Sequence, residues 1–532
     1  MPVRTVPVMD DKRPEQPSGA ASSARDRGGR RPLAAATFSG MRWSYTDAAV
    51  TGVMQLLYVS IMSRLLTPAA FGIMAIAFLI VNFGQQFSQM GVAQALIQRP
   101  EISADDVRAG FTASVALGVI LFAVLWLISP QIAAFFTMPE SVPVLRVMGA
   151  QFIFSSLGVT SQGLLRRDLR FKTLAVTQLS SYFVGYMVIG LALAYAGAGV
   201  WSLVIGVLAV NLLSSLSQYA VARHDVRPLF SFRRFDHLYG YGARVSGVNV
   251  MQFLTKQLDT FAVGRYASTA LLGQYNRAFT VVSTPMSRHL MIALSRVLLP
   301  AYSKIQHDSD RLGRAYASVL TLGGTVMLSI AAGMAVAAQE IVSVILGDQW
   351  NRAADFVPFF AFALAIRTMS NFAEILAQAR DDLRRLLVIQ VIYLLALWGA
   401  YVAVERLHNI VLFAVVLMMG ELVKQVVYVA VVQPILGLRV VDWIRAYAPA
   451  IVCALITGTV VLGARVVCVR LDVIAVVTLF IEVLAGAVGL AVGIRANPYR
   501  HLRSEFGERF QAAGALETQV GATAARLVLG RW

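Results

Sequence analysis

The organisation of the chain follows from residues 238–299, which read LYGYGARVSGVNVMQFLTKQLDTFAVGRYASTALLGQYNRAFTVVSTPMSRHLMIALSRVLL. Its pattern predicts two long apolar helices joined by a short turn. Each helix carries polar side chains spaced three or four residues apart, which places them on one face of the helix. The first stripe is Asn249, Gln252, Lys256 and Asp259, and the second is Arg277, Thr280, Thr284, Arg288 and Ser295. Because a charge in hydrocarbon costs at least about 2.5–3.5 kcal/mol, these stripes should face a wet cavity or each other. We predict that they line a transport pathway.

The composition of the whole chain agrees with a membrane location. Of its 532 residues, 57% are hydrophobic and only 14% are charged, and the mean hydropathy is +0.66. Soluble domains carry about 25% charged residues, so we expect an all-α polytopic membrane protein. The net charge of +17 fits basic cytoplasmic loops better than a nucleic-acid partner, and we expect none of the latter.

Fourteen segments are long and apolar enough to span a bilayer. They lie near 43–64, 69–93, 108–129, 142–165, 172–196, 200–222, 238–263, 271–299, 314–338, 354–379, 384–404, 409–434, 443–465 and 472–494. Lys and Arg gather in alternate loops, whereas the 196–200 loop has none. This bias predicts that both termini are cytoplasmic.

The terminal segments and the two cysteines predict no signal peptide, disulfide or metal site. Residues 1–38 lack an apolar core and predict a disordered, basic cytoplasmic tail rather than a signal peptide, and residues 496–532 predict a second cytoplasmic tail. Cys453 and Cys468 fall near opposite ends of one predicted helix, roughly 22 Å apart, so no disulfide is expected. The chain has no metal-binding spacing.

An internal repeat has a period near 200 residues. Residues 53–57 recur at 250–254, and Phe71-Gly72 matches Leu272-Gly273. Weaker matches follow in the same order, in the pairs 131–135 and 340–344, 142–143 and 357–358, and 168–170 and 382–384. Each copy holds six spans, so we expect two lobes related by a pseudo-twofold axis along the membrane normal. The predicted division is an N-lobe at 39–225, a C-lobe at 226–438 and two further helices at 439–495.

The two repeats differ in charge. The N-lobe stripes hold Asp47, Thr51, Gln55 and Tyr58 in the first span, and Asn82, Gln86 and Gln89 in the second. The C-lobe spans hold the cations Arg244, Lys256, Arg277, Arg288, Arg367 and Lys424, against the acids Asp259, Glu374 and Glu421. Unpaired cations need an anion, and arginine recognises phosphate in bidentate geometry. The predicted substrate-binding residues are therefore Arg277, Arg288, Lys256, Arg367, Gln252, Asn249, Gln55, Gln86 and Gln89.

Pairing within the membrane is the competing interpretation. Lys256 with Asp259, Arg367 with Glu374, and Glu421 with Lys424 are each spaced so that they would neutralise one another on a helix face.

Gating and coupling give a further set of hypotheses. Asp47 and Arg244 occupy equivalent repeat positions and would pair to close an inner gate. Pro285 would kink its span, as a hinge or as a static bend. The chain has no Walker A loop, so coupling to a proton or sodium gradient is the default, with Asp47, Asp259 and Glu374 as candidate ion carriers and no cofactor.

The loops around the first and fourth spans carry a family resemblance. Ser63-Arg64-Leu65-Leu66-Thr67-Pro68 followed by Phe71-Gly72, and the run from Leu164 to Lys172, resemble bacterial polysaccharide exporters. These form the polysaccharide transport branch of the multidrug/oligosaccharidyl-lipid/polysaccharide flippase superfamily. The resemblance covers about 38–495. It implies two six-helix lobes around a V-shaped cavity, and flipping of undecaprenyl-pyrophosphate-linked oligosaccharide from the inner to the outer leaflet of a bacterial plasma membrane.

The predicted function is therefore a flippase for lipid-linked oligosaccharide that works by alternating access. Its partners would be that substrate, membrane lipid, and a polysaccharide polymerase with its chain-length machinery. One alternative is an ion-coupled multidrug or metabolite exporter of the related fold. The other is a polytopic polymerase or glycosyltransferase, although no outer loop is long enough for a convincing catalytic set.

Overall fold

The computed structural model describes residues 50–88, 102–229, 250–286, 298, 299, 301–379, 383–497 and 499. These residues form helices, turns and short connections, and no strand occurs among them. The all-helical prediction is confirmed.

The described N-lobe is one bundle of helices running in alternating directions. It begins with the helix Val50–Leu65. The helices that follow are α2 (Pro68–Ser88), α4 (Ala104–Phe135), α5 (Ser141–Met148), α6 (Ala150–Arg167), α7 (Phe171–Tyr182), the π-helix η1 (Phe183–Gly190), α8 (Leu191–Tyr195) and α9 (Val200–Ala222).

The C-lobe begins with a helix at residues 250–266. After it come α11 (Thr269–Met286), α13 (Ser309–Val336), α14 (Ala338–Ile345), the short turns η2 (Asp348–Trp350) and α15 (Asn351–Ala354), α16 (Val357–Ala379), α17 (Leu383–Glu405) and α18 (Val411–Leu436). The last two helices, α19 (Val440–Arg470) and α20 (Ala475–Ala496), pack on each other and on α13. Cys453 and Cys468 are free and buried on α19, as expected.

Eleven helices in the described residues are long and apolar enough to cross a membrane. They match eleven of the fourteen predicted spans. The count of fourteen is not confirmed, because the first, seventh and eighth predicted spans lie partly outside the described residues. Their described parts are the helices at 50–65, 250–266 and 269–286. The proposed 1–38 tail and almost all of the C-terminal tail also lie outside.

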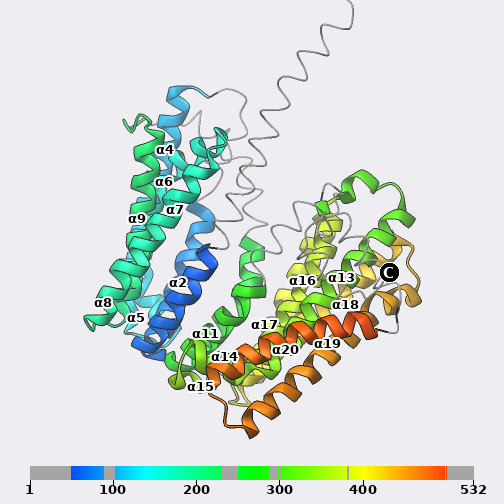
Figure 1. The fold of residues 1–532 in the computed structure, drawn as a ribbon. Helices are drawn as coiled ribbons and strands as arrows, with labels where there is room; N and C mark the ends of the chain where they lie inside the picture. Colours follow the sequence, from blue (N-terminus) through cyan, green and yellow to red (C-terminus); the bar gives the residue numbers. More distant parts are fainter. Residues whose placement is uncertain are drawn as a thin grey trace, which may run out of the picture.

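The two lobes form the arms of a V (Figure 1). They converge where α5, α8, α14 and α15 lie, which we call the closed end, and diverge toward the other end. Helix direction places the basic connection between α6 and α7, with Arg167 and Arg170, at the diverging end. The connection between α8 and α9, which has no basic residue, lies at the closed end.

Two glycines let the repeats touch at the closed end. A Cβ on Gly72 would lie 1.8 Å from the backbone oxygen of Thr269, and a Cβ on Gly273 would lie 1.9 Å from that of Pro68. Glycine pairs are the feature that permits such close backbone approach. Gly72 and Gly273 are the matched glycines of the internal repeat, and Pro68 and Thr269 precede them by the same interval. The pseudo-twofold relation predicted from the repeat is therefore visible as one reciprocal contact between α2 and α11.

Hydrogen bonds from the segment after α14 also join the lobes. Trp350 is fully buried, and its indole Nε1 donates to the carbonyl oxygen of Ser63 at 2.7 Å. Gln349 Nε2 donates to the carbonyl of Leu66 at 3.1 Å, and Arg64 donates through Nη2 to the carbonyl of Val344 at 2.6 Å. We call these three hydrogen bonds, together with the Phe71–Trp350 ring contact at 5.3 Å between ring centres, the closed-end latch.

Candidate functional site

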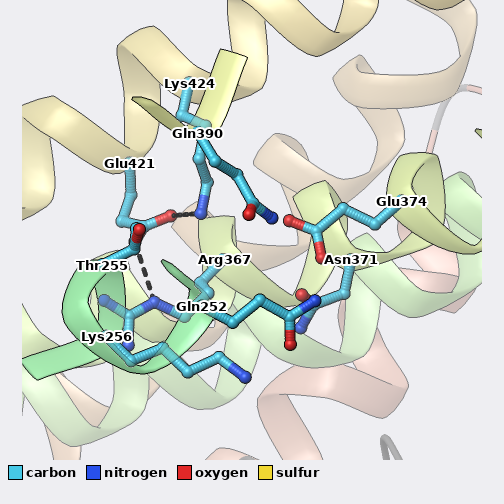
Figure 2. Close-up of a pocket in the computed structure, with 9 residues that line it drawn as sticks. All are labelled: Gln252, Thr255, Lys256, Arg367, Asn371, Glu374, Gln390, Glu421 and Lys424. Atoms are coloured by element: carbon cyan, nitrogen blue, oxygen red, sulfur yellow. Dashed lines mark hydrogen bonds and ion pairs between the residues drawn. The ribbon is translucent and has the colours of Figure 1, made fainter. Parts of the chain in front are cut away.

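A polar pocket lies within the C-lobe, between the 250–266 helix, α16, α17 and α18 (Figure 2). Amides, cations and acids line it although all four helices are otherwise apolar. Such residues inside spanning helices mark functional sites, because burying them in hydrocarbon is costly. The lining residues are Gln252, Thr255, Lys256, Arg367, Asn371, Glu374, Gln390, Glu421 and Lys424.

Glu421 joins two of the pocket's cations. Its Oε1 lies 2.8 Å from Arg367 Nε, and its Oε2 lies 2.7 Å from Lys424 Nζ (Figure 2). Tyr393 also donates its hydroxyl to Oε1 at 3.2 Å, and Lys424 stands over the Tyr393 ring. Glu421 is 1% exposed, so the Coulombic attraction acts in a low-dielectric setting. One carboxylate thus holds two positive side chains on one wall of the pocket.

Of the three pocket cations, Lys256 is the one that forms no ion pair within the described part of the chain. It is exposed. The pocket holds three cations, Lys256, Arg367 and Lys424, against two acids, Glu374 and Glu421, which leaves one positive charge. The cationic excess predicted for the C-lobe is thus present here, but it is smaller than the excess of three counted over all its spans.

The ion pairs considered for Arg367 with Glu374 and for Lys256 with Asp259 are not formed in the structure. Arg367 bonds to Glu421 on a neighbouring helix and not to Glu374 on its own helix. Glu374 instead accepts a hydrogen bond from the Tyr428 hydroxyl at 3.0 Å. Asp259, 3% exposed, accepts one from Tyr275 at 3.3 Å rather than pairing with Lys256. The reason is geometric, since neighbouring helices reach these groups more closely than residues along the same helix. The Glu421–Lys424 pair is confirmed.

Arg277 lies apart from this pocket, at the contact between the lobes. Its guanidinium carbon is 4.4 Å from the centre of the Phe71 ring on α2. Its Nη2 donates to Asn276 at 3.4 Å, and its buried Nε has no hydrogen-bond partner among the described residues. A cation–π contact stabilises the charge, and no ion pair with a described carboxylate accompanies it. Arg277 and Lys256 do not line the same pocket.

The N-lobe residues predicted to bind substrate do not line the pocket. Gln55 is half-buried on the first helix, and Gln86 donates to its own helix at the carbonyl of Asn82. Tyr58, on the same predicted stripe, is buried against Tyr186 at 4.7 Å between ring centres. Five predicted site residues lie outside the described part of the chain: Asn249, Arg288, Gln89, Asp47 and Arg244.

Three of the lining residues are not among those predicted to bind substrate: Thr255, Asn371 and Gln390. A signal existed for one of them. Arg367, Asn371 and Glu374 are four and three residues apart, which is the spacing of one helix face. Gln390 could not be found in this way, because it is a single polar residue in an apolar span.

The overall arrangement resembles two kinds of solved transporter structure. The lipid II flippase MurJ, in its inward closed conformation, matches with a TM-score of 0.66 and 12% identity, over 86% of this chain and 99% of that one. An inward-facing multidrug resistance MATE family transporter matches with a TM-score of 0.57 and 15% identity, over 73% of this chain and 95% of that one. The chain therefore shares the fold of these two multi-pass membrane proteins.

The family follows from the sequence comparisons. Residues 61–355 match the family model described as polysaccharide biosynthesis protein, and the chain belongs to this family. It is 23% identical to the lipopolysaccharide biosynthesis protein WzxC of Escherichia coli K12, over 65% of this chain and 71% of that one. It is 26% identical to the succinoglycan biosynthesis transport protein ExoT of Rhizobium meliloti, over 61% and 66%. The teichuronic acid biosynthesis protein TuaB of Bacillus subtilis is 22% identical, over 65% and 72%.

Proposed function

We propose that this chain is a flippase that moves undecaprenyl-pyrophosphate-linked oligosaccharide from the inner to the outer leaflet of a bacterial plasma membrane by alternating access. Its family acts in polysaccharide biosynthesis, and one relative is named as a transport protein. The observation that carries the proposal is the positive charge left over in a pocket among spanning helices. A pyrophosphate supplies the anion that such a charge requires.

The other lining groups suit the sugar part of that substrate. Gln252, Asn371 and Gln390 offer amide donors and acceptors to sugar hydroxyls. The polyprenyl tail, being apolar, would stay in the bilayer while the head group enters the pocket. The polymerase and chain-length proteins remain proposed partners, because they would consume the translocated unit.

The distribution of basic residues supports the direction of transport. The connections and helix ends at the diverging end carry Arg167, Arg170, Arg223, Arg227 and Arg311, and the positive-inside rule assigns this end to the cytoplasm. On this assignment both termini are cytoplasmic, and the lobes diverge toward the side where the lipid-linked sugar is made.

Binding to the purified protein tests the proposal. Full-length protein in lipid nanodiscs would be titrated with undecaprenyl-pyrophosphate-linked oligosaccharide and followed by native mass spectrometry. Lys256→Ala should raise the Kd about 10-fold or more, since a charge-assisted hydrogen bond contributes about 1.5–3 kcal/mol. Lys304→Ala removes an exposed cation outside the pocket and should bind like the wild type.

Two outcomes would contradict the proposal. Equal affinity of Lys256→Ala and the wild type would remove the pocket from the substrate site. Binding of cationic drugs in place of the lipid-linked sugar would favour the multidrug exporter. In cells, a deletion strain should accumulate lipid-linked units on the inner leaflet, whereas loss of a polymerase would leave single units exported.

A further inference from the structure

A second group of charged side chains lies where α14, α19 and α20 meet, away from the pocket. Arg465 on α19 lies 3.0 Å, through Nε, from Oε1 of Glu340 on α14, and its Nη1 donates to the carbonyl of Val336 at 3.0 Å. Glu482 on α20 interacts electrostatically with both Glu340 and Arg465. Glu340 and Glu482 are 8% and 2% exposed. The group therefore holds two buried carboxyl side chains, Glu340 and Glu482, and one positively charged side chain, Arg465.

Glu482 is the member without a partner. Both of its carboxylate oxygens are buried and make no hydrogen bond to any residue that the structure describes, and the same holds for Oε2 of Glu340. With both acids ionised the group would carry one uncompensated negative charge among spanning helices, which costs several kcal/mol. A proton on Glu482 removes that charge.

Within the described part of the chain, the other cations of α19 and α20 do not lie beside this group. Arg470 is exposed five residues beyond Arg465, and Arg445 and Arg495 lie about 30 Å and about 20 Å along their helices from Arg465 and Glu482. The helices packed against α20 are α19, α14 and α13. The charged residues of α13 are Asp310, Arg311 and Arg314, all in its first two turns. Those turns lie at the diverging end, about 30 Å along the helix from its end at Val336. Arg465 is thus the cation for which Glu340 and Glu482 compete.

The segment that holds Glu340 also holds the closed-end latch. Val344 on α14 accepts the hydrogen bond from Arg64 of the N-lobe. Trp350, which bonds to Ser63, follows Glu340 by ten residues. A change in the Arg465–Glu340 contact therefore acts on the short helix that fastens one lobe to the other.

We propose that Glu482 is a proton-binding site that controls this latch. With Glu482 protonated, Arg465 stays on Glu340 and on the carbonyl of Val336, and α14 holds the latch closed. When the proton leaves to water, the Glu482 carboxylate attracts Arg465 away from Glu340, and the latch loosens. The inference rests on the proposed transport function, for which it supplies a coupling ion and a site distinct from Asp47, Asp259 and Glu374.

Distance measurement across the closed end tests this inference. Spin labels would replace Tyr195 on the N-lobe and Leu407 on the C-lobe, which are 71% and 65% exposed, in full-length protein whose two native cysteines are changed to alanine. Between about pH 5 and about pH 9, a range that brackets a buried carboxyl, the wild-type distance should lengthen as the pH rises. Glu482→Gln and Glu482→Leu, which carry no titrating charge, should keep the short distance throughout. Asp472→Asn, an exposed acid in the turn between α19 and α20, should respond like the wild type.

The infrared carbonyl band of a protonated carboxyl gives a second readout. That band should weaken in Glu482→Gln and stay unchanged in Asp472→Asn. The inference is overturned if Glu482→Gln keeps the full pH response, or if the distance follows sodium at constant pH. The distance and infrared measurements contain no substrate, so they test the proton site alone. The proposed transport function is tested separately by the titration with lipid-linked oligosaccharide.

Discussion

At the residue scale, Glu421 determines the charge of the candidate site. It neutralises one of two adjacent cations and fixes both against the wall of the pocket. Lys256 forms no ion pair with any described residue, so its charge can meet a ligand. A buried ion pair is poor evidence for stability on its own, because desolvation offsets the attraction. Here the consequence of the pair is positional, since it holds Arg367 and Lys424 in the pocket that Lys256 also lines.

Removal of the Glu421 charge should destabilise the protein. Glu421→Gln leaves Arg367 and Lys424 in the pocket without their acid, and breaking such a buried pair costs about 3–5 kcal/mol. We expect a clear fall in Tm, measured on purified protein in detergent. Adding Lys424→Met should recover part of the loss, because one uncompensated charge disappears. Glu405→Gln, at the end of α17, is the matched control, and a Tm for Glu421→Gln equal to that of this control would refute the argument.

At the element scale, the crossing of α2 and α11 joins the lobes. The helices approach so closely at Gly72 and Gly273 that a methyl group at either position would overlap a backbone oxygen. Backbone atoms cannot rotate away as a flexible side chain can. The two helices must therefore separate if either glycine is replaced.

Alanine at these glycines should weaken the contact between the lobes. Gly72→Ala and Gly273→Ala should each cost about 1–3 kcal/mol or more through overpacking. Gly463→Ala on α19 meets nothing within 4 Å and should instead add up to about 1 kcal/mol through helix propensity. The Tm of the three variants would be compared, and equal values for the two sets would contradict the crossing geometry.

At the scale of the whole molecule, the closed-end latch keeps the lobes together at one end while they diverge at the other (Figure 1). Trp350 contributes both a buried ring against Phe71 and a hydrogen bond to Ser63. In a transporter that works by alternating access, such contacts must break for the opposite side to open. The strength of the closed-end latch therefore sets the relative populations of two states, one in which the lobes touch at this end and one in which they have separated there.

Trp350→Phe should shift that balance toward separated lobes. The change keeps an aromatic ring but deletes the indole donor, a net loss of about 0.5–1.5 kcal/mol, or roughly 2- to 10-fold in population. The label pair at positions 195 and 407 would report it as a larger long-distance fraction. Trp201→Phe, on the partly exposed start of α9, should leave the distribution unchanged. An unaltered distribution in Trp350→Phe would show that the indole bond does not hold the latch.

Features that depend on local pattern follow from the sequence alone. Runs of apolar residues predict the eleven candidate spans of the described residues. The internal repeat matches Phe71-Gly72 with Leu272-Gly273, and the structure shows that the two glycine positions lie at one close crossing of α2 and α11. Helical spacing identified the Glu421–Lys424 pair and placed Gln252 and Lys256 on one face. These predictions succeed because hydropathy and helical periodicity depend on residues within about two helical turns of one another.

Which polar helix faces lie against one another depends on the packing of the helices and cannot be read from the sequence. The partner of Arg367 lies 54 residues away on α18, and Arg277 rests on a ring from the other lobe. Gln390 enters the pocket as a lone polar residue, and Glu482 meets Arg465 and Glu340 through the packing of three helices. Periodicity shows which side of a helix is polar, but the neighbour of that side is set by how the helices pack against one another.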